Sequence, residues 1–257
     1  MSRFGHLEFE GHLEHPPRET GAVADEAACL QAAQAAFEQA GFEQALRWFA
    51  KAIEYNPQSS VAWAGQARML IELGEFTEAK LWVDKALERF PRNAELLAAK
   101  AVALARTGDV RAALAFSDAA LQERDDTPYL WLARGDVLLA GEEKRADYCF
   151  TRALALAPQH WLWPWLASRI HYFYERFSLA LKYVSQALEL DATRSAVWLQ
   201  MGRCQLALGM AGPARNACEQ ARHLDPRAPD LAALAAGVRE PGLWSRVTGL
   251  WRRYRRR

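Results

Sequence analysis

Several kinds of segment are missing from this chain of 257 residues, and each absence excludes a class of protein. No run approaches the roughly 18 to 20 apolar residues that a membrane-spanning helix needs. Residues 1–10 contain no apolar stretch of the signal-peptide type, which favours a cytoplasmic protein. No segment alternates apolar and polar residues as a half-buried strand does. There is no glycine-rich phosphate loop, nucleophile elbow or histidine pair at metal spacing, so we expect neither an enzyme nor a bound cofactor.

Cysteine is also scarce. The four cysteines, Cys29, Cys149, Cys204 and Cys218, fall within predicted helices and have no close pairing in the sequence. Such residues are typical of reduced, packed thiols in an interior rather than of a disulfide framework. Their spacing does not indicate a metal site.

Periodic alanine is what the sequence has in abundance. Six alanines recur at a nearly constant period of about 34 residues: Ala45, Ala79, Ala113, Ala146, Ala180 and Ala214. The interval between Ala113 and Ala146 is one position shorter than the others. Two more sets keep the same intervals, namely Ala52, Ala86, Ala120, Ala153, Ala187 and Ala221, and the small residues Ala33, Ala67, Ala101, Gly135, Ser168 and Gly202. We call these three sets of small residues ladders. Because they keep the same period, they predict a stacked repeat in which each unit buries its apolar face against its neighbours.

The period and its residues resemble the tetratricopeptide repeat, a helix-turn-helix unit of about 34 residues. The second repeat carries the pattern on Trp63, Ala67, Gly74, Ala79, Ala86 and Pro91, and the fourth and sixth repeats carry it on Trp131, Gly135, Ala146, Phe150, Ala153 and Pro158, and on Trp198, Gly202, Gly209, Ala214, Ala221 and Pro226. Elsewhere the pattern drifts, because Cys29, Leu97 and Pro164 stand at the tryptophan position. The resemblance implies an all-α fold, a right-handed α-solenoid that binds a protein or peptide along a concave groove lined by the first helices.

Four segments follow from this pattern. Residues 1–25 are expected to be a disordered leader, residues 26–227 six repeats, residues 228–240 a helix that caps the last repeat, and residues 241–257 a basic amphipathic tail. Within the repeats, Gly74, Gly108 and Gly209 are predicted to adopt positive φ after first helices, and Pro57, Pro91, Pro158 and Pro226 to end second helices. We expect Trp63, Trp131, Trp198, Phe49 and Phe150 to fill the gaps beside the small residues.

The groove positions carried over from the family give a mostly apolar wall with arginines set into it. These are Arg68, Arg169 and Arg203, which share one repeat position, and Arg106. A guanidinium binds a carboxylate through two hydrogen bonds while its stem packs on apolar surface. We therefore predict a site for a partner peptide with apolar and acidic residues. The alternative is that these arginines pair with neighbours such as Glu72 or Asp136 and line an ordinary solvated wall.

Aromatic residues concentrate in the fifth repeat, between residues 160 and 177. We expect Trp165, Tyr172 and Phe173 to face the groove beside Arg169, while Trp163 and Tyr174 pack between helices. Tryptophan, tyrosine and arginine dominate binding hot spots, so this repeat is predicted to hold the main anchor. The alternative is that the cluster is core. The lysine and asparagine clamp by which some relatives capture chaperone tails is absent, since its places hold Leu30, Gln34, Gly65, Glu95 and Ala99.

The formal charge of +1 conceals a basic C-terminus, because residues 239–257 contain seven arginines and one glutamate. In the tail an apolar stripe of Leu243, Trp244, Val247, Leu250, Trp251 and Tyr254 is bordered by arginines, among them Arg252 and Arg253. Three uses stay open: binding to an anionic membrane surface, binding to a partner, or packing back on the sixth repeat. The repeats themselves are nearly neutral, which disfavours nonspecific nucleic-acid binding.

These patterns predict a protein–protein interaction scaffold or adaptor without catalytic activity. An alternative is a membrane-peripheral assembly factor or chaperone-like protein that its basic tail localises. A self-assembling repeat is the third interpretation.

Overall fold

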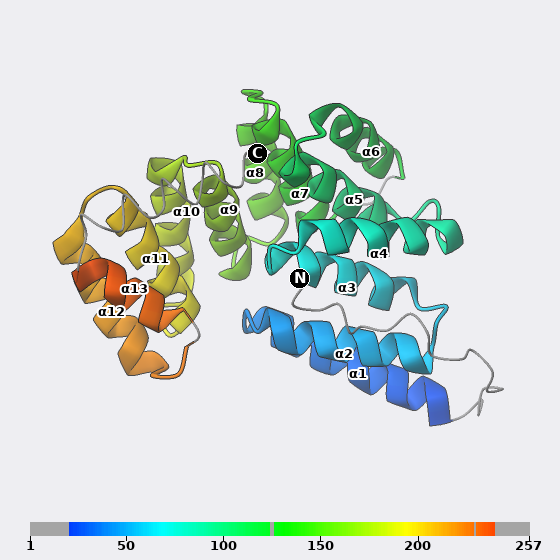
Figure 1. Ribbon diagram of the computed structural model, residues 1–257, viewed down its shortest axis with the longest axis horizontal. Coiled ribbons are helices and arrows are strands. Elements are labelled where there is room, and N and C mark those ends of the chain that lie inside the picture. The colour runs from blue at the N-terminus through cyan, green and yellow to red at the C-terminus, as the bar shows by residue number, and fades with distance from the viewer. Residues whose placement is uncertain (1–20, 124–125, 229, 240–257) are drawn as a thin grey trace. The chain divides into compact units, whose positions relative to one another are not determined.

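The computed structural model describes residues 21–123, 126–228 and 230–239, with the side chains of residues 21–24 excepted. Within these ranges the chain forms thirteen helices and no strand (Figure 1). The all-α prediction is confirmed. The chain divides into two compact units, unit 1 (Met1–Ala153) and unit 2 (Leu154–Arg257), and the division falls near the end of one helix.

Unit 1 is a series of helix pairs in which the second helix of each pair follows a short turn. Its helices are α1 (Gly21–Glu38), α2 (Phe42–Tyr55), α3 (Ser60–Glu72), α4 (Phe76–Arg89), α5 (Ala94–Thr107), α6 (Val110–Gln122), α7 (Pro128–Ala140) and α8 (Ala146–Leu156). The first helices α3, α5 and α7 also pack on one another in sequence. Helix α1 begins at Gly21, within the segment expected to be a disordered leader.

Unit 2 repeats the arrangement. It contains α9 (Leu162–Phe173), α10 (Phe177–Leu190), α11 (Ser195–Ala207), α12 (Ala211–Leu224) and α13 (Leu231–Arg239). Helix α13 packs on α11 and α12, as expected of a helix that covers the last repeat.

The alanine ladders explain why the helices pack so closely. All twelve members of the first two ladders are at most 2% exposed, as are Ala33, Ala67, Ala101 and Ser168 of the third. A residue with a small side chain lets the backbone of a neighbouring helix approach. At Gly135 a Cβ atom would lie 2.8 Å from Cζ of Phe150, so the phenyl ring of α8 occupies the space that this glycine leaves on α7.

The turn residues behave as the sequence predicts. Gly74, Gly108 and Gly209 have φ values of 84°, 99° and 78°. Residues with a Cβ atom rarely adopt this left-handed region. The corresponding turns of the other three repeats use Ala40, Glu142 and Glu175 in the same left-handed region, with φ values of 60°, 57° and 61°. Pro57, Pro91, Pro158 and Pro226 each follow the end of a second helix by two residues. Side-chain caps begin several first helices, as where Asn93 accepts a hydrogen bond of 2.9 Å from the Leu96 amide.

Of the five gap-filling aromatic residues, three are buried and two are not. Trp63, Phe49 and Phe150 are at most 6% exposed. Trp131 and Trp198 are only half-buried, and their indole N–H groups bond to the preceding loops. The four cysteines are free and buried.

Candidate functional site

The candidate site is the first-helix face, by which we mean the surface of α3, α5 and α7 in unit 1 and of α9 and α11 in unit 2. Each unit is considered separately. In unit 1 the guanidinium of Arg68 on α3 lies between two aromatic rings. Its Cζ atom is 4.1 Å from the ring centre of Phe37 on α1 and 4.3 Å from that of Tyr129 on α7. Burial lowers the pKa of Arg68 below its usual value.

Arg106 is committed to an acid of the next repeat. Its Nε and Nη2 atoms bind both carboxylate oxygens of Asp136, at 2.6 to 3.1 Å. The two side chains are only 8% and 3% exposed. The ion pair joins α5 to α7. Removing either partner would leave an uncompensated buried charge, which is strongly destabilising. The prediction that Arg106 binds a partner carboxylate is therefore corrected, because Asp136 already occupies it.

The aromatic cluster of unit 2 is arranged differently from the prediction. Trp165 is 4% exposed, and its indole N–H donates a hydrogen bond of 3.0 Å to the carbonyl of Ala196 on α11. Trp163, which the sequence predicts in the core, is the more exposed of the two. Trp165 thus joins α9 to α11, and the prediction of an accessible indole anchor at this residue is corrected.

The neighbours of Trp165 remain partly accessible. The guanidinium carbon of Arg169 lies 4.9 Å from the centre of the Trp165 ring, a cation–π contact that holds the side chain over the indole. Tyr172 and Phe173 are half-buried at the end of α9. The Tyr172 ring meets Phe177 of α10 edge-on at 5.2 Å, and the Phe173 ring meets Tyr174 at 5.1 Å. The helix end therefore presents aromatic surface next to a positioned cation.

Arg203 extends this surface on α11. It stands one repeat period after Arg169, and its side chain is 27% exposed. Its Nη2 atom lies 2.7 Å from Asp230, which is half exposed and immediately precedes α13. A partly exposed ion pair of this kind contributes less to stability than a buried one.

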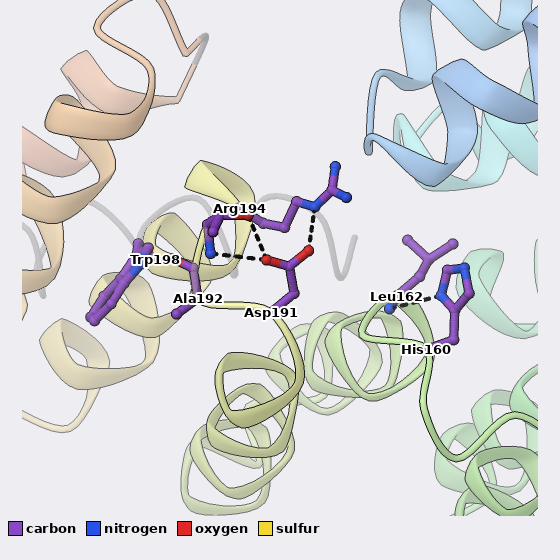
Figure 2. Close-up of polar contacts among 7 residues, drawn as sticks. His160, Leu162, Asp191, Ala192, Arg194 and Trp198 are labelled. Atoms are coloured by element: carbon purple, nitrogen blue, oxygen red, sulfur yellow. Dashed lines mark hydrogen bonds and ion pairs between the residues drawn. The ribbon is translucent and has the colours of Figure 1, made fainter.

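The loop between α10 and α11 fixes the start of α11 (Figure 2). Asp191 accepts hydrogen bonds from the backbone and hydroxyl of Thr193, at 2.9 and 2.6 Å, and from Nε of Arg194 at 2.7 Å. The Thr193 hydroxyl is the main cause that lowers the pKa of Asp191. The Trp198 indole N–H donates to the Ala192 carbonyl at 2.8 Å. In the fifth repeat, which lacks this tryptophan, Nδ1 of His160 instead accepts from the Leu162 amide (Figure 2).

Buried polar groups of unit 2 also make contacts that the sequence did not predict. His171 is fully buried, and its ring stacks on Tyr183 of α10 with the centres 5.0 Å apart. The Gln200 amide donates to Ser168 Oγ at 3.2 Å and approaches the Cys204 sulfur. Burial raises the pKa of Cys204 to about 12, so this thiol stays protonated and unreactive. Periodicity placed Ser168 and Cys204 in helices, but only the packing of α9 on α11 brings them together.

Formal charge is divided between the units. Residues 21–153 contain 15 Lys and Arg and 20 Asp and Glu, a net charge of −5. Residues 154–239 contain nine Lys and Arg and six Asp and Glu, a net charge of +3. The near neutrality of the repeats as a whole conceals this division. The described parts of the two units therefore carry net charges of opposite sign.

The predicted tail residues lie outside the part of the chain that the structure describes. Trp244, Trp251, Arg252, Arg253 and Tyr254 of the tail lie outside the described residues. No cluster of three or more His, Cys, Asp or Glu side chains suited to a metal ion occurs in the described ranges. In the same ranges, no helix has the length and apolar character needed to cross a bilayer.

Comparison with known proteins agrees with the repeat pattern. Two tetratricopeptide repeat models match the chain, one over residues 30–94 and 71–129 and the other over residues 174–237. A search of curated proteins finds no match.

Solved structures share the fold at low sequence identity. A chain of the APC/C hetero-tetramer Cut9–Hcn1 is 17% identical with a TM-score of 0.54, over 86% of this chain and 43% of that one. A tetratricopeptide repeat protein from Parabacteroides merdae is 14% identical with a TM-score of 0.55, over 84% of each chain. The type IV pilus biogenesis factor PilW is 20% identical with a TM-score of 0.50, over 82% of this chain and 98% of that one. At these identities the likeness concerns the fold alone.

Proposed function

Given that the chain belongs to the tetratricopeptide repeat family, we propose that it is a protein-interaction scaffold that captures a partner segment on the first-helix face of unit 2. Repeat proteins of this kind offer extended binding surfaces. We propose that this chain has no catalytic role, since no catalytic motif occurs in its sequence.

The observation that carries the proposal is the seating of Arg169 on the Trp165 ring beside Tyr172 and Phe173. The indole limits the rotamers of the guanidinium, so less conformational entropy is lost when a ligand carboxylate binds. The two half-buried aromatic rings supply apolar contact area next to the charge. Arg203 supplies a second cation on the adjacent helix.

The chemistry of the partner follows from these groups. A segment with one or two carboxylates separated by apolar side chains fits Arg169 and Arg203 together with Tyr172 and Phe173. The net charge of +3 on residues 154–239 favours the same class of ligand. In unit 1 the net charge has the opposite sign, Arg68 is buried between Phe37 and Tyr129, and Arg106 is buried in an ion pair with Asp136.

The test compares two charge reversals of the same kind in the full chain. Arg169→Glu changes the proposed face, and Arg215→Glu changes an exposed arginine on α12, a second helix. Partners captured from native lysate are identified by mass spectrometry, and their affinities are then measured by calorimetry. We expect Arg169→Glu to weaken binding by about tenfold or more and Arg215→Glu to leave it unchanged. Equal affinities for the two variants, both folded by circular dichroism, would refute the proposal.

A membrane-peripheral role for the tail stays a separate proposal, supported by the sequence of residues 241–257 alone. It predicts that the full chain floats with anionic vesicles and that a chain ending at Glu240 does not. If both chains remain with the unbound protein, the tail has no such role.

A further inference from the structure

Helix α13 stands where the first helix of a seventh repeat would begin. Ala232 and Ala236 stand one full repeat period after Trp198 and Gly202 of α11. Leu231, Leu234 and Val238 are buried in a cluster with residues of α11 and α12, as a next first helix would be. Each of the six earlier first helices is followed by a second helix, whereas the described residues end with α13 itself.

The outer side of α13 has the character of an incomplete repeat. The third ladder is buried in all six repeats, but its seventh member, Ala236, is exposed. A shallow notch at the start of α13 is lined by Arg222, Pro226, Arg227, Ala228, Leu231, Ala232 and Ala235. In the fourth repeat the equivalent small residue, Gly135, is covered by Phe150 of its own second helix. Ala236 lacks such a cover among the described residues.

The tail sequence has the pattern of a second helix. The pattern is seen when the tail is aligned with α12, the preceding second helix, at an interval one position shorter than the full period. This shortened interval places Gly242 on Gly209, the turn glycine with φ of 78°. It also places the apolar residues Val247, Leu250, Trp251 and Tyr254 on Ala214, Ala217, Cys218 and Ala221, which are the four buried residues of α12. Arg246, Arg252, Arg253 and Arg255 fall on exposed positions of α12, as do Ser245, Thr248 and Gly249.

The alternative, an interval of one full period, fails. It would place Thr248, Arg252 and Arg255 on the buried positions Ala214, Cys218 and Ala221. The shortened interval already occurs between Ala113 and Ala146, so it is compatible with this repeat. Agreement of a turn glycine with four apolar positions is more than amphipathic character alone requires.

We propose that residues 243–254 are the second helix of a seventh repeat and pack on the outer side of α13, with Trp251 over Ala236. The spacing between α13 and Leu243 equals the spacing between α3 and α4, between α9 and α10, and between α11 and α12. Packing there buries Trp251 and leaves the arginines in solvent, beside Arg222 and Arg227. The basic charge of the tail then forms the end surface of unit 2, and the apolar stripe is not available to a membrane.

The test is amide hydrogen exchange in α13 of the full chain, with two matched variants. Trp251→Arg puts a charge on the proposed buried side, and Thr248→Arg adds the same charge on the proposed exposed side. We expect α13 to exchange about tenfold faster in Trp251→Arg and in a chain ending at Glu240, and to be unchanged in Thr248→Arg. Exchange in α9 and α11 reports whether the rest of unit 2 stays folded.

The proposal fails if α13 exchanges equally in the full and shortened chains, or if Thr248→Arg has the same effect as Trp251→Arg. It also fails if protection of residues 243–254 requires vesicles of phosphatidylglycerol, which would favour the membrane role.

A disulfide cross-link between α13 and the tail tests the proposed contact without relying on a change in stability. Under mild oxidation the pair Ala236→Cys and Trp251→Cys is expected to form a disulfide, and the pair Ala236→Cys and Thr248→Cys is not.

Discussion

Single residues of the first-helix face differ in the aromatic rings beside their side chains. Arg68 and Arg169 occupy the same repeat position, yet Arg68 lies between Phe37 and Tyr129, whereas Arg169 lies over the indole of Trp165. The repeat position determines where an arginine lies on the first helix but not which residues surround its guanidinium. What surrounds it depends on residues of other repeats, such as Tyr129, which no local pattern connects to Arg68.

A buried amide in unit 1 offers a direct test of packing at the residue scale. Lys100 and Arg134 form ion pairs with Asp84 and Asp118 of the preceding second helices. Gln66 holds the same repeat position, but Ala50 stands where the aspartate would be. Gln66 is fully buried, and its amide atoms have no hydrogen-bond partner among the described residues.

We therefore expect Gln66→Met to raise the free energy of unfolding by about 1 to 2 kcal/mol, because it removes unsatisfied buried polar atoms while keeping the volume. Urea denaturation measures this. The matched control is Gln200→Met, which removes an amide of similar burial that bonds to Ser168 and is expected to destabilise. Destabilisation by Gln66→Met would mean that the amide has a partner after all.

Cys204 gives a prediction about pH. Its folded pKa of about 12 lies above the ordinary value of 9.0, so the folded state keeps the thiol proton over a range where the unfolded chain loses it. The resulting stability is fully present below the unfolded pKa and is lost as pH rises toward the folded one. We expect the difference in stability between the natural chain and Cys204→Ala to shrink across this range in urea titrations at increasing pH.

At neutral pH, iodoacetamide should label Cys204 on the order of a thousandfold more slowly in the folded chain than in urea. Rapid labelling would contradict the burial.

At the scale of elements, tryptophans that begin first helices also hold the preceding loops. The indole N–H of Trp63 donates to the Pro57 carbonyl at 3.0 Å, and that of Trp198 donates to the Ala192 carbonyl at 2.8 Å. In both cases the acceptor lies six positions earlier. Each bond fixes the angle at which one repeat enters the next, so the tryptophan is an anchor for the loop as well as a packing residue.

We expect Trp198→Phe to lower the free energy of unfolding by about 1 kcal/mol, because the ring is kept and one hydrogen bond is lost. Thermal denaturation of the full chain measures this. Trp48→Phe is the control, since the Trp48 indole has no hydrogen bond among the described residues and contacts Lys51 through its ring. Equal losses in the two variants would show that the hydrogen bond contributes nothing.

Much of the element structure could be predicted from the sequence. Ladders of small residues located every described helix pair, because close packing of neighbouring helices requires small residues at one period. Proline located the ends of four second helices, because it cannot continue a helix. The positive φ values of Ala40, Glu142 and Glu175 could not be predicted, since residues other than glycine adopt them only under the constraint of the packed helices. The early start of α1 could not be predicted either, because residues 21–25 carry no repeat signature.

The surroundings of the candidate binding residues were harder to predict than the helices. The family pattern located Arg68, Arg106, Arg169 and Arg203 on first helices, but it did not reveal that Asp136 binds Arg106 or that Trp165 bonds to Ala196. Each of these contacts joins neighbouring repeats and depends on side-chain rotamers that periodicity does not specify. Tyr172, Phe173 and Arg169 remain the candidates that the geometry of unit 2 supports best.

At the scale of the whole molecule, the two units differ in the sign of their net charge. The net charge of −5 on residues 21–153 and of +3 on residues 154–239 predicts that an acidic partner contacts unit 2 and leaves unit 1 unaffected. Binding through exposed arginines also predicts weaker affinity at higher salt.

Hydrogen exchange of the full chain with and without its captured partner tests this central claim most directly. We predict that the partner slows exchange in α9 and α11, around Arg169 and Arg203, and that α3 and α5 exchange at their original rates. Slower exchange confined to unit 1, or to the second helices α10 and α12, would contradict the claim that the first-helix face of unit 2 is the binding surface.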